Sequence, residues 1–330
     1  MNVKITIAVP VYGVETRIER CAVSLFEQTY DNIEYIFIND CTPDNSIDIL
    51  KETIERYPER KGNVIIHSHS QNEGLASSRN SAIRIATGDY IMHVDSDDFI
   101  DKKTVELCVE KQKEGNYDIV SYGIVGHKGH YLDHWHKPHI DSVQGLTCAA
   151  LARRYPVNLA STMIKLSLYK ENNIVAIKGI NMSEDYQVMP KLFYYARSVA
   201  WIDDYLYHYD CTNENSYTAS VMSEKEKQVW VTIDELTRFF RDKGDSYLKS
   251  LEDGKISIYI DQKIKAGINC DATFLKEIIF RINKTDRRSW KKVPFPYRLI
   301  LMIDNLMILR YYILFSVKIK NLIKIVCHRS

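Results

Sequence analysis

The sequence predicts an α/β fold in which a doubly wound, mostly parallel sheet carries helices on both faces. Short apolar runs alternate with amphipathic segments of helical period three times in the first ninety residues. Such alternation is typical of right-handed crossovers between parallel strands. Polar residues follow each apolar run, and in sheets of this kind ligands bind at the carboxyl ends of the strands. The pattern therefore predicts a ligand site at one edge of the sheet.

The first ninety residues contain four predicted strands and three predicted helices. The strands are the apolar runs at residues 3–9, 33–38, 64–66 and 90–94. The first and third helices are the amphipathic segments at residues 15–29 and 75–86. The second helix should begin at Thr42 and Pro43, because a capping residue followed by proline is typical of a first helical turn. Its buried face would be Ile47, Leu50 and Ile54.

Composition narrows the class of protein. A chain of 330 residues that is 45% hydrophobic can form one domain of roughly 200 to 250 residues with an appendage. The net charge of +1 argues against a nucleic-acid binder. Seven scattered cysteines without a C-x-x-C pair indicate neither a disulfide framework nor a zinc site. The N-terminus lacks a long apolar core and a small-residue cleavage site, so we expect a cytoplasmic protein.

Three carboxylates follow the fourth predicted strand, in the sequence IMHVDSDD. Asp95, Asp97 and Asp98 would repel one another, by roughly 4 kcal/mol for two charges 4 Å apart at an effective dielectric near 20. A divalent cation would remove that repulsion, and Mg²⁺ is usually held by one or two carboxylates together with substrate phosphates. An EF-hand loop is excluded because Ile100 stands where that loop needs glycine. A solvated acidic turn that caps the next helix remains the alternative.

Six motifs occur in order in this part of the chain. They are residues 9–12, 24–30 with Glu34, 39–44, 72–74 with Ala76, Arg79 and Asn80, 88–90, and 95–98. Together they resemble the family 2 glycosyltransferases of the GT-A fold. A thinner resemblance continues through residues 182–185, 205–209 and 215–218, which look like the acceptor side of that family. The resemblance implies a catalytic domain at residues 1–220 and a helical, basic region at residues 221–330.

The resemblance also implies an activity. Such an enzyme would move a sugar, with inversion, from a nucleotide sugar, most often UDP-linked, to a hydroxyl of a glycan or lipid-linked acceptor in surface polysaccharide synthesis. Two alternatives remain. A nucleotidyltransferase is disfavoured because no G-x-G-T-R loop follows the first strand. A non-catalytic nucleotide- or glycan-binding domain is disfavoured by the intact set Asp95, Asp97 and Asp185.

By resemblance, Asp97 is the principal ligand of a Mn²⁺ or Mg²⁺ ion, and Asp95 contacts the ribose or the same ion. Whether Asp98 shares the ion remains open. The residues expected to bind the nucleotide sugar are Pro10, Tyr12, Asp40, Gly74, Arg79 and Asp95. Asp40 would accept a hydrogen bond from the base, and Gly74 would permit close approach of the backbone to the nucleoside. Arg79 would stay charged beside the acidic cluster and order it.

The resemblance places the general base at Asp185, with Glu184 as the second choice. A carboxylate opposite the metal can take the proton of the acceptor hydroxyl while that hydroxyl attacks the anomeric carbon. The alternative is that both acids stabilise the start of a predicted helix at residues 186–195. Relatives often carry arginine where this chain has Asp210, so His208 becomes a candidate contact for the diphosphate.

Other segments are less informative. Residues 117–125 predict a strand and residues 223–241 an amphipathic helix. The histidine-rich segment at residues 127–139 predicts a loop, and without acidic or cysteine partners in its pattern a solvated or acceptor-contacting loop is favoured over a metal site.

The C-terminal region differs from the rest of the chain in the sign of its net charge. Residues 276–330 hold 13 Lys or Arg against 3 Asp or Glu, a net charge of +10, whereas residues 1–275 hold 31 against 40, a net charge of −9. Charges interrupt the apolar segment 296–327, so no run of roughly 20 uncharged residues could cross a membrane. Either this segment lies on an anionic membrane surface, on the cytoplasmic face of the plasma membrane, with residues such as Leu299, Ile300 and Ile303 in the interface, or it packs as ordinary helices.

Overall fold

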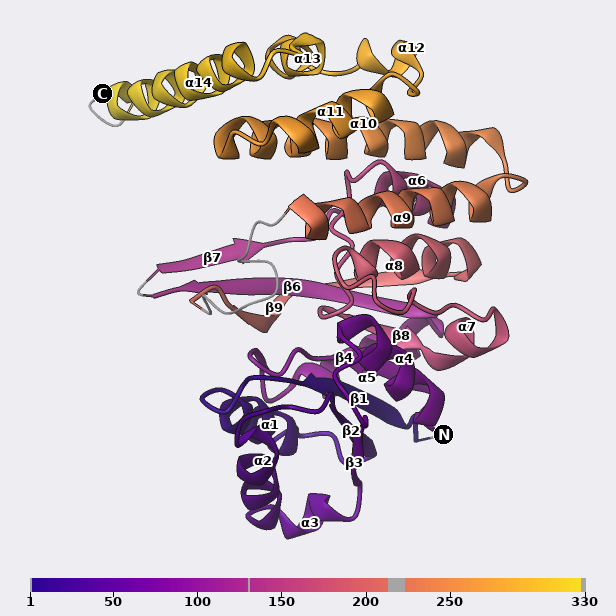
Figure 1. Cartoon of the computed structure of the whole chain (residues 1–330). Coiled ribbons are helices and arrows are strands. Elements are labelled where there is room, and N and C mark those ends of the chain that lie inside the picture. The colour runs from indigo at the N-terminus through magenta and orange to yellow at the C-terminus, as the bar shows by residue number, and fades with distance from the viewer. Residues whose placement is uncertain (1, 130, 213–222, 328–330) are drawn as a thin grey trace. The chain divides into compact units, whose positions relative to one another are not determined.

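The computed structural model describes residues 2–129, 131–212 and 223–327, and it contains two compact units (Figure 1). The first unit comprises residues 1–150 and 155–220, and the second comprises residues 151–154 and 221–330. The expected acceptor-side motif at residues 215–218 lies outside the described residues. The assignment of the catalytic role to residues 1–220 stays a prediction.

The first unit is built on a sheet with nine strands among the described residues. The strands are β1 (Ile5–Val11), β2 (Ile33–Asn39), β3 (Val64–Ser68), β4 (Tyr90–His93), β5 (Phe99–Ile100), β6 (Ile119–Lys128), β7 (Tyr131–Trp135), β8 (Thr162–Lys165) and β9 (Val199–Asp210). Their order is β3-β2-β1-β4-β8-β6-β9-β5, and β7 pairs with β6 outside that path.

Eight helices of the described chain accompany this sheet. They are α1 (Ile18–Phe26), α2 (Ser46–Glu55), α3 (Pro58–Lys61), α4 (Leu75–Ile85), α5 (Thr104–Gly115), α6 (Val143–Leu151), α7 (Leu166–Glu171) and α8 (Glu184–Tyr195). Alternate strand residues face two separate cores. Buried residues of α1, α2 and α5 pack on one face, and those of α4, α6, α7 and α8 pack on the other (Figure 1). The sheet is therefore covered on both faces, as predicted.

The half of the sheet that contains β1 to β4 follows the prediction. β2 pairs in parallel with both β1 and β3, and β1 pairs in parallel with β4. All four predicted strands are confirmed within a few residues. α2 begins later than expected, at Ser46, because Asp44 accepts hydrogen bonds from the Ser46 amide at 3.2 Å and from Thr42 Oγ1 at 2.6 Å. Thr42 thus shapes the loop before the helix and does not cap the helix itself.

The other half of the sheet is mixed. β8 pairs antiparallel with β4 and β6, β5 pairs antiparallel with β9, and β6 pairs in parallel with β9. The loop predicted for the histidine-rich segment is wrong for much of its length, since residues 127–128 end β6 and residues 131–135 form β7. All five side chains of β7 are exposed, so this strand has no buried face and little apolar periodicity from which to predict it.

The second unit is helical in its described residues. Its helices are α9 (Ser223–Phe240), α10 (Asp245–Asn269), α11 (Ala272–Ile282), α12 (Arg287–Trp290), α13 (Phe295–Met302) and α14 (Leu306–Cys327). α10 packs against α9, α11, α13 and α14. The buried Lys263 of α10 donates to the Leu301 carbonyl and to Asp304, both at 3.1 Å, which anchors the break between α13 and α14. No helix in the described part of the chain is long and apolar enough to cross a membrane.

Candidate active site

The acidic motif forms a tight turn directly after β4. The Asp98 amide donates to the Asp95 carbonyl at 3.0 Å, which closes the turn. Asp95 and Asp97 are half-buried, whereas Asp98 is fully buried. The three carboxylates therefore do not share one environment, and only the first and third residues of D-S-D are open to a ligand.

Both oxygens of Asp98 are engaged within the protein. Its Oδ2 accepts from the Tyr207 hydroxyl at 2.6 Å, and its Oδ1 accepts from the Asp210 amide at 2.8 Å. Burial, with repulsion from Asp97 and Asp95, raises the pKa of Asp98 to about 8. These contacts tie the turn to β9 and favour a structural role for Asp98 over a share of the metal.

Arg79, on α4, joins the acidic turn to the acidic pair at the start of α8. Its Nη2 donates to Asp95 Oδ1 at 2.9 Å, and its Nη1 donates to Glu184 Oε1 at 2.6 Å and to Asp185 Oδ1. The Arg79 side chain is 4% exposed. One buried cation thus contacts three carboxylates, the farthest of which lies 106 residues from it in the sequence.

The two acids of α8 differ in how they face solvent. The side chain of Asp185 is 25% exposed and that of Glu184 is 10% exposed. Burial and the charge of the other acids raise the pKa of both carboxyls, although Arg79 opposes the rise. Asp185 is therefore the member of the pair that an incoming hydroxyl can reach more easily.

Asp40, just after β2, bonds to the turn at Gly74, which leads from β3 into α4. Asp40 Oδ1 accepts from the Glu73 amide at 2.8 Å and contacts His69 Nδ1 at 2.7 Å, while Oδ2 accepts from the Gly74 amide at 2.7 Å. Gly74 has φ +86°, and a Cβ there would collide with the side chain of Asn181. Asp40 thus fixes the turn, and its contact with a base remains a prediction.

Pro10 and Tyr12 lie at the same edge of the sheet. Pro10 is in β1 beside Ile38 of β2, and Tyr12, just after β1, is 50% exposed. The Asp40 amide donates to the Val11 carbonyl at 3.1 Å, which holds the ends of β1 and β2 together. The structure therefore brings Pro10, Tyr12 and Asp40 to one edge, as expected from the ends of neighbouring parallel strands.

The candidate phosphate contact at His208 has a different setting. His208 stacks on Phe99 with ring centroids 4.4 Å apart, and its Nδ1 lies 2.9 Å from His127 Nε2. Asp210 pairs at 3.3 Å with Arg17, the residue before α1, and at 2.9 Å with Arg20 of α1. Positive charge near this end of β9 therefore comes from α1 and the residue before it.

Sequence reasoning missed several residues that shape the site. They are Arg17, Arg20, Tyr207, Asn181 and Lys137. Lys137 is 6% exposed, its Nζ donates to the Ser161 carbonyl at 3.1 Å, and burial lowers its pKa to about 7 although Asp185 opposes this. Each of these residues makes its contact with a segment more than twenty residues away in the chain, so no local pattern could reveal it.

Comparison with known proteins decides the family. The family model described as glycosyl transferase family 2 matches residues 6–176. The chain belongs to glycosyl transferase family 2. The resemblance proposed from the six motifs is thereby confirmed.

Two of the curated relatives of this glycosyltransferase family 2 chain come from Bacillus species. It is 30% identical over 222 residues to the uncharacterized glycosyltransferase EpsJ of Bacillus subtilis, covering 65% of this chain and 62% of EpsJ. It is 31% identical over 213 residues to a poly(ribitol-phosphate) beta-glucosyltransferase of Bacillus spizizenii, covering 62% of this chain and 32% of that protein. The chain thus spans less than two thirds of the length of either relative.

A solved structure confirms the GT-A fold. Residues 1–349 of S. aureus TarS, crystallised in complex with UDP-GlcNAc, superpose with a TM-score of 0.75 at 16% identity. The match covers 96% of this chain and 92% of that one. The likeness establishes the α/β fold with its helical C-terminal region.

The donor set fits a divalent cation, which enzymes of this family with the GT-A fold generally use. Asp95 and Asp97 are two half-buried carboxylates on one tight turn. Among the described residues no three His, Cys, Asp or Glu side chains converge to hold an ion by themselves. A site with two carboxylates, completed by oxygens of the substrate, is the arrangement that Mg²⁺ and similar ions adopt with phosphates.

Proposed function

We propose that this family 2 enzyme transfers a sugar from a UDP-sugar to a hydroxyl of a glycan or lipid-linked acceptor in surface polysaccharide synthesis, with inversion of the anomeric centre. The observation that carries the proposal is the position of Arg79 between Asp95 and Asp185. Arg79 holds Asp95, which is suited to binding the donor, close to Asp185, which is suited to deprotonating the acceptor. The named relative that glucosylates poly(ribitol-phosphate) and the UDP-GlcNAc complex of TarS support this choice of substrates.

On the donor side, Asp97 and Asp95 would hold a Mn²⁺ or Mg²⁺ ion. The ion supplies charge neutralisation for the diphosphate leaving group when it is bound. Arg79 fixes the rotamer of Asp95 through its 2.9 Å hydrogen bond. Pro10, Tyr12, Asp40 and the Gly74 turn would line the nucleoside at the carboxyl ends of the strands.

On the acceptor side, Asp185 would accept the proton of the attacking hydroxyl. The hydroxyl oxygen forms its bond to the anomeric carbon as the bond from that carbon to the diphosphate oxygen breaks, and the diphosphate leaves with the electron pair. One displacement from the opposite face inverts the configuration. Glu184 is more buried and shares Arg79, so it would position Asp185 and the guanidinium.

A donor screen tests the proposal. UDP-, GDP- and TDP-sugars are incubated with the protein, with and without Mn²⁺, and hydrolysis and thermal stabilisation are measured. We expect a UDP-sugar to stabilise the fold and to be hydrolysed slowly in a Mn²⁺-dependent manner. If no nucleotide sugar bound, the proposed transferase activity would be rejected.

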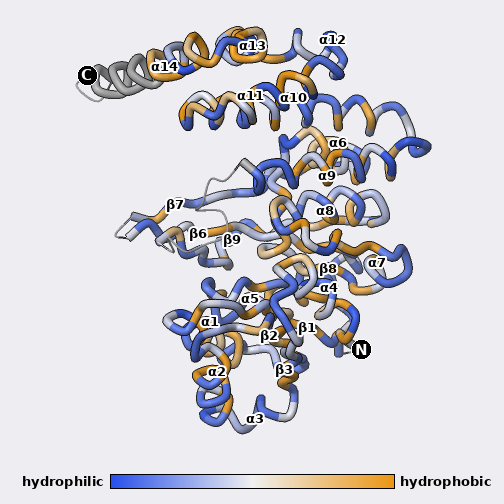
Figure 2. Tube along the Cα trace, in the orientation of Figure 1, coloured by the Kyte–Doolittle hydropathy of each residue, from blue (hydrophilic) through white to orange (hydrophobic). Residues whose placement is uncertain are grey.

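We also propose that the second unit docks on an anionic membrane surface, where a lipid-linked acceptor would be reached. Large apolar side chains on α13 and α14 are exposed by 49 to 80%: Phe295, Met302, Met307, Ile308, Tyr311, Leu314 and Phe315. The positions from Met307 to Phe315 recur at helical spacing and so share one face of α14. Figure 2 shows hydrophobic and hydrophilic positions interspersed along both helices.

Basic residues lie near this apolar segment in the sequence. They are Arg287, Arg288, Lys291, Lys292, Arg298 and Arg310. Each basic residue near an anionic surface contributes on the order of 1 kcal/mol to binding, in addition to the burial of apolar area.

The expectation that Ile300 enters the interface is wrong, since Ile300 is 5% exposed and packs inside the unit. The apolar contact would come from the seven exposed residues of α13 and α14 instead.

A further inference from the structure

Arg20 lies against the acidic turn, as Arg79 does, but it contacts the backbone of the turn. Its Nη2 donates to the backbone carbonyl of Asp97 at 2.7 Å and to Asp210 Oδ2 at 2.9 Å. Its Cζ atom lies 4.8 Å from the centre of the Phe99 ring. The turn that carries the candidate metal ligands is thus flanked by two arginines, one from α4 and one from α1.

The two arginines differ in what remains available for a ligand. Arg79 is 4% exposed and contacts three carboxylates. The Arg20 side chain is 45% exposed, and both contacts above use Nη2. Because a guanidinium carries five N–H donors, three on Nε and Nη1 are without a partner among the described residues. Arg20 is therefore the cation beside this turn that can still accept an anionic partner.

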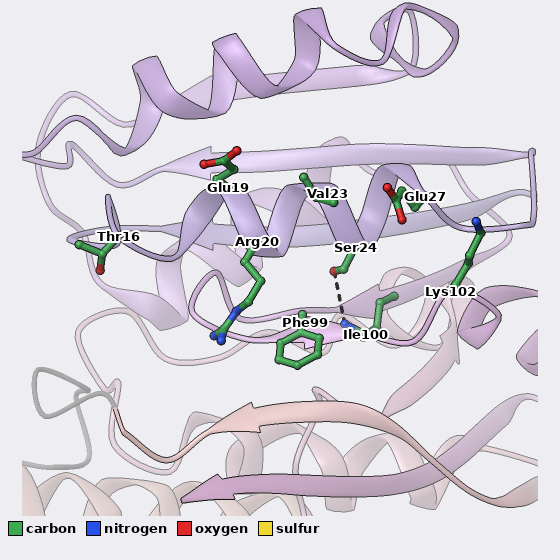
Figure 3. A pocket seen from close by; sticks show the side chains of 9 residues that line it. All are labelled: Thr16, Glu19, Arg20, Val23, Ser24, Glu27, Phe99, Ile100 and Lys102. Carbon is green, nitrogen blue, oxygen red and sulfur yellow. Dashed lines mark hydrogen bonds between the residues drawn. The ribbon is translucent and has the colours of Figure 1, made fainter. Parts of the chain in front are cut away.

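Figure 3 shows how Arg20 is presented. Its side chain leaves α1 and runs alongside Phe99, at the edge of a hollow of about 480 Å³ between α1 and residues 99–102. The hollow leaves room around the guanidinium, and the Phe99 contact restricts its orientation. A charged group that is held in place in this way loses little conformational entropy on binding a ligand.

Asp210 does not prevent Arg20 from serving a ligand. Arg17 Nε contacts the same Asp210 oxygen at 3.3 Å, and the Thr212 amide donates to the other oxygen at 2.9 Å. These contacts would continue to satisfy Asp210 if Arg20 turned toward another anion. The rearrangement therefore leaves no unpaired buried charge, the outcome that usually makes such exchanges costly.

We propose that Arg20 is a second cationic contact for the diphosphate of the donor, next to the ion held at Asp97. The proposal rests on the proposed function, because that function places a diphosphate at the Asp97 turn. Arginine suits phosphate oxygens because its N–H donors match their spacing and its charge does not titrate. Arg20 of α1 would thus supply a positive charge to the diphosphate, although no local sequence motif predicts this role.

Calorimetric titration with UDP and with uridine, in Mn²⁺ at constant ionic strength, tests this contact. The variants are Arg20→Met, which keeps the alkyl stem on Phe99, and Arg20→Lys, which keeps the charge. Arg56→Met is the matched control, because Arg56 forms an exposed ion pair with Glu19 on the surface of α2. Loss of charged hydrogen bonds should reduce the preference for UDP over uridine roughly 10- to 100-fold in Arg20→Met.

Uridine affinity should stay unchanged in all variants, Arg20→Lys should lose part of the preference, and Arg56→Met should match the wild type. Preference for UDP that is intact in both Arg20 variants would overturn the role of Arg20 and leave the proposed function standing. A wild-type protein that binds UDP no better than uridine would overturn both, because no diphosphate site would then exist at the turn.

Discussion

Arg79 donates from Nη2 to Oδ1 of Asp95 at 2.9 Å, so a buried cation on α4 directly fixes the first carboxylate of the D-S-D turn. The same guanidinium also contacts Glu184 and Asp185. The guanidinium offsets the cost of removing these three carboxylates from water, because a poorly solvated charge without a partner is unfavourable.

Replacement of Arg79 should therefore destabilise the fold as well as the site. We expect Arg79→Met to lower the free energy of unfolding by about 3 kcal/mol, since it leaves the buried Glu184 and the half-buried Asp95 and Asp185 without their cation. Urea denaturation followed by circular dichroism measures the loss. Arg56→Met, which breaks an exposed pair, should cost less than about 1 kcal/mol. Equal effects of the two substitutions would show that the Arg79 network is not a buried charge cluster in solution.

Asp185→Asn should separate donor binding from transfer. The amide can still accept a hydrogen bond from Arg79, but it cannot take the acceptor proton, so UDP affinity should hold while transfer falls by roughly 10² to 10⁴-fold. Glu184→Gln, at the more buried position, should have the smaller effect. Retained transfer in Asp185→Asn, or a product with the anomeric configuration of the donor, would move the base elsewhere or exclude inversion.

Part of this site could be predicted from the sequence, and part could not. The strand ends at Tyr12, Asp40 and Asp95 meet because neighbouring parallel strands end at one edge, a rule that needs only local patterns. The burial of Asp98 depends on Tyr207, 109 residues away, and the placement of Arg20 depends on Asp210, 190 residues away. These pairings form only when the chain packs, so neither secondary-structure propensity nor the spacing of residues in a motif predicts them.

Lys137 should make stability depend on pH. Burial lowers its pKa in the folded protein to about 7, whereas an unfolded lysine keeps its proton up to about 10.4. Between these values the unfolded chain binds one more proton, so stability rises with pH there, by up to about 1.4 kcal/mol per pH unit from this group. The cost of burying the charged ammonium is absent above about pH 10.4, grows as the pH falls, and is fully present below about pH 7.

Urea denaturation of the wild type and of Lys137→Met between pH 7 and 10 isolates this contribution. Methionine has no proton to release, so the difference in unfolding free energy between the two proteins should grow in favour of the wild type as the pH rises. Parallel stability profiles would mean that the Lys137 ammonium reaches water in the folded protein.

The apolar face of α13 and α14 should govern membrane binding. In the full chain, Met307→Ser combined with Tyr311→Ser should reduce co-sedimentation with anionic liposomes, because both exposed side chains lose contact with the interface. Phe280→Ser, 63% exposed on α11, is the matched control. Binding should also weaken with salt, since charges are screened within about 8 Å at physiological ionic strength. If the full chain did not co-sediment with anionic liposomes at low salt, this surface would be excluded as a membrane-docking site.

The measurement that tests the donor site most directly is calorimetric titration of UDP into the wild type and Asp97→Asn, each with and without Mn²⁺. Asn keeps the shape of Asp97 but removes the charge that would hold the cation. We predict that Mn²⁺ tightens UDP binding to the wild type and that Asp97→Asn loses this increment. UDP affinity that does not respond to Mn²⁺ in the wild type, or that responds equally in Asp97→Asn, would contradict a metal-diphosphate site at the turn after β4.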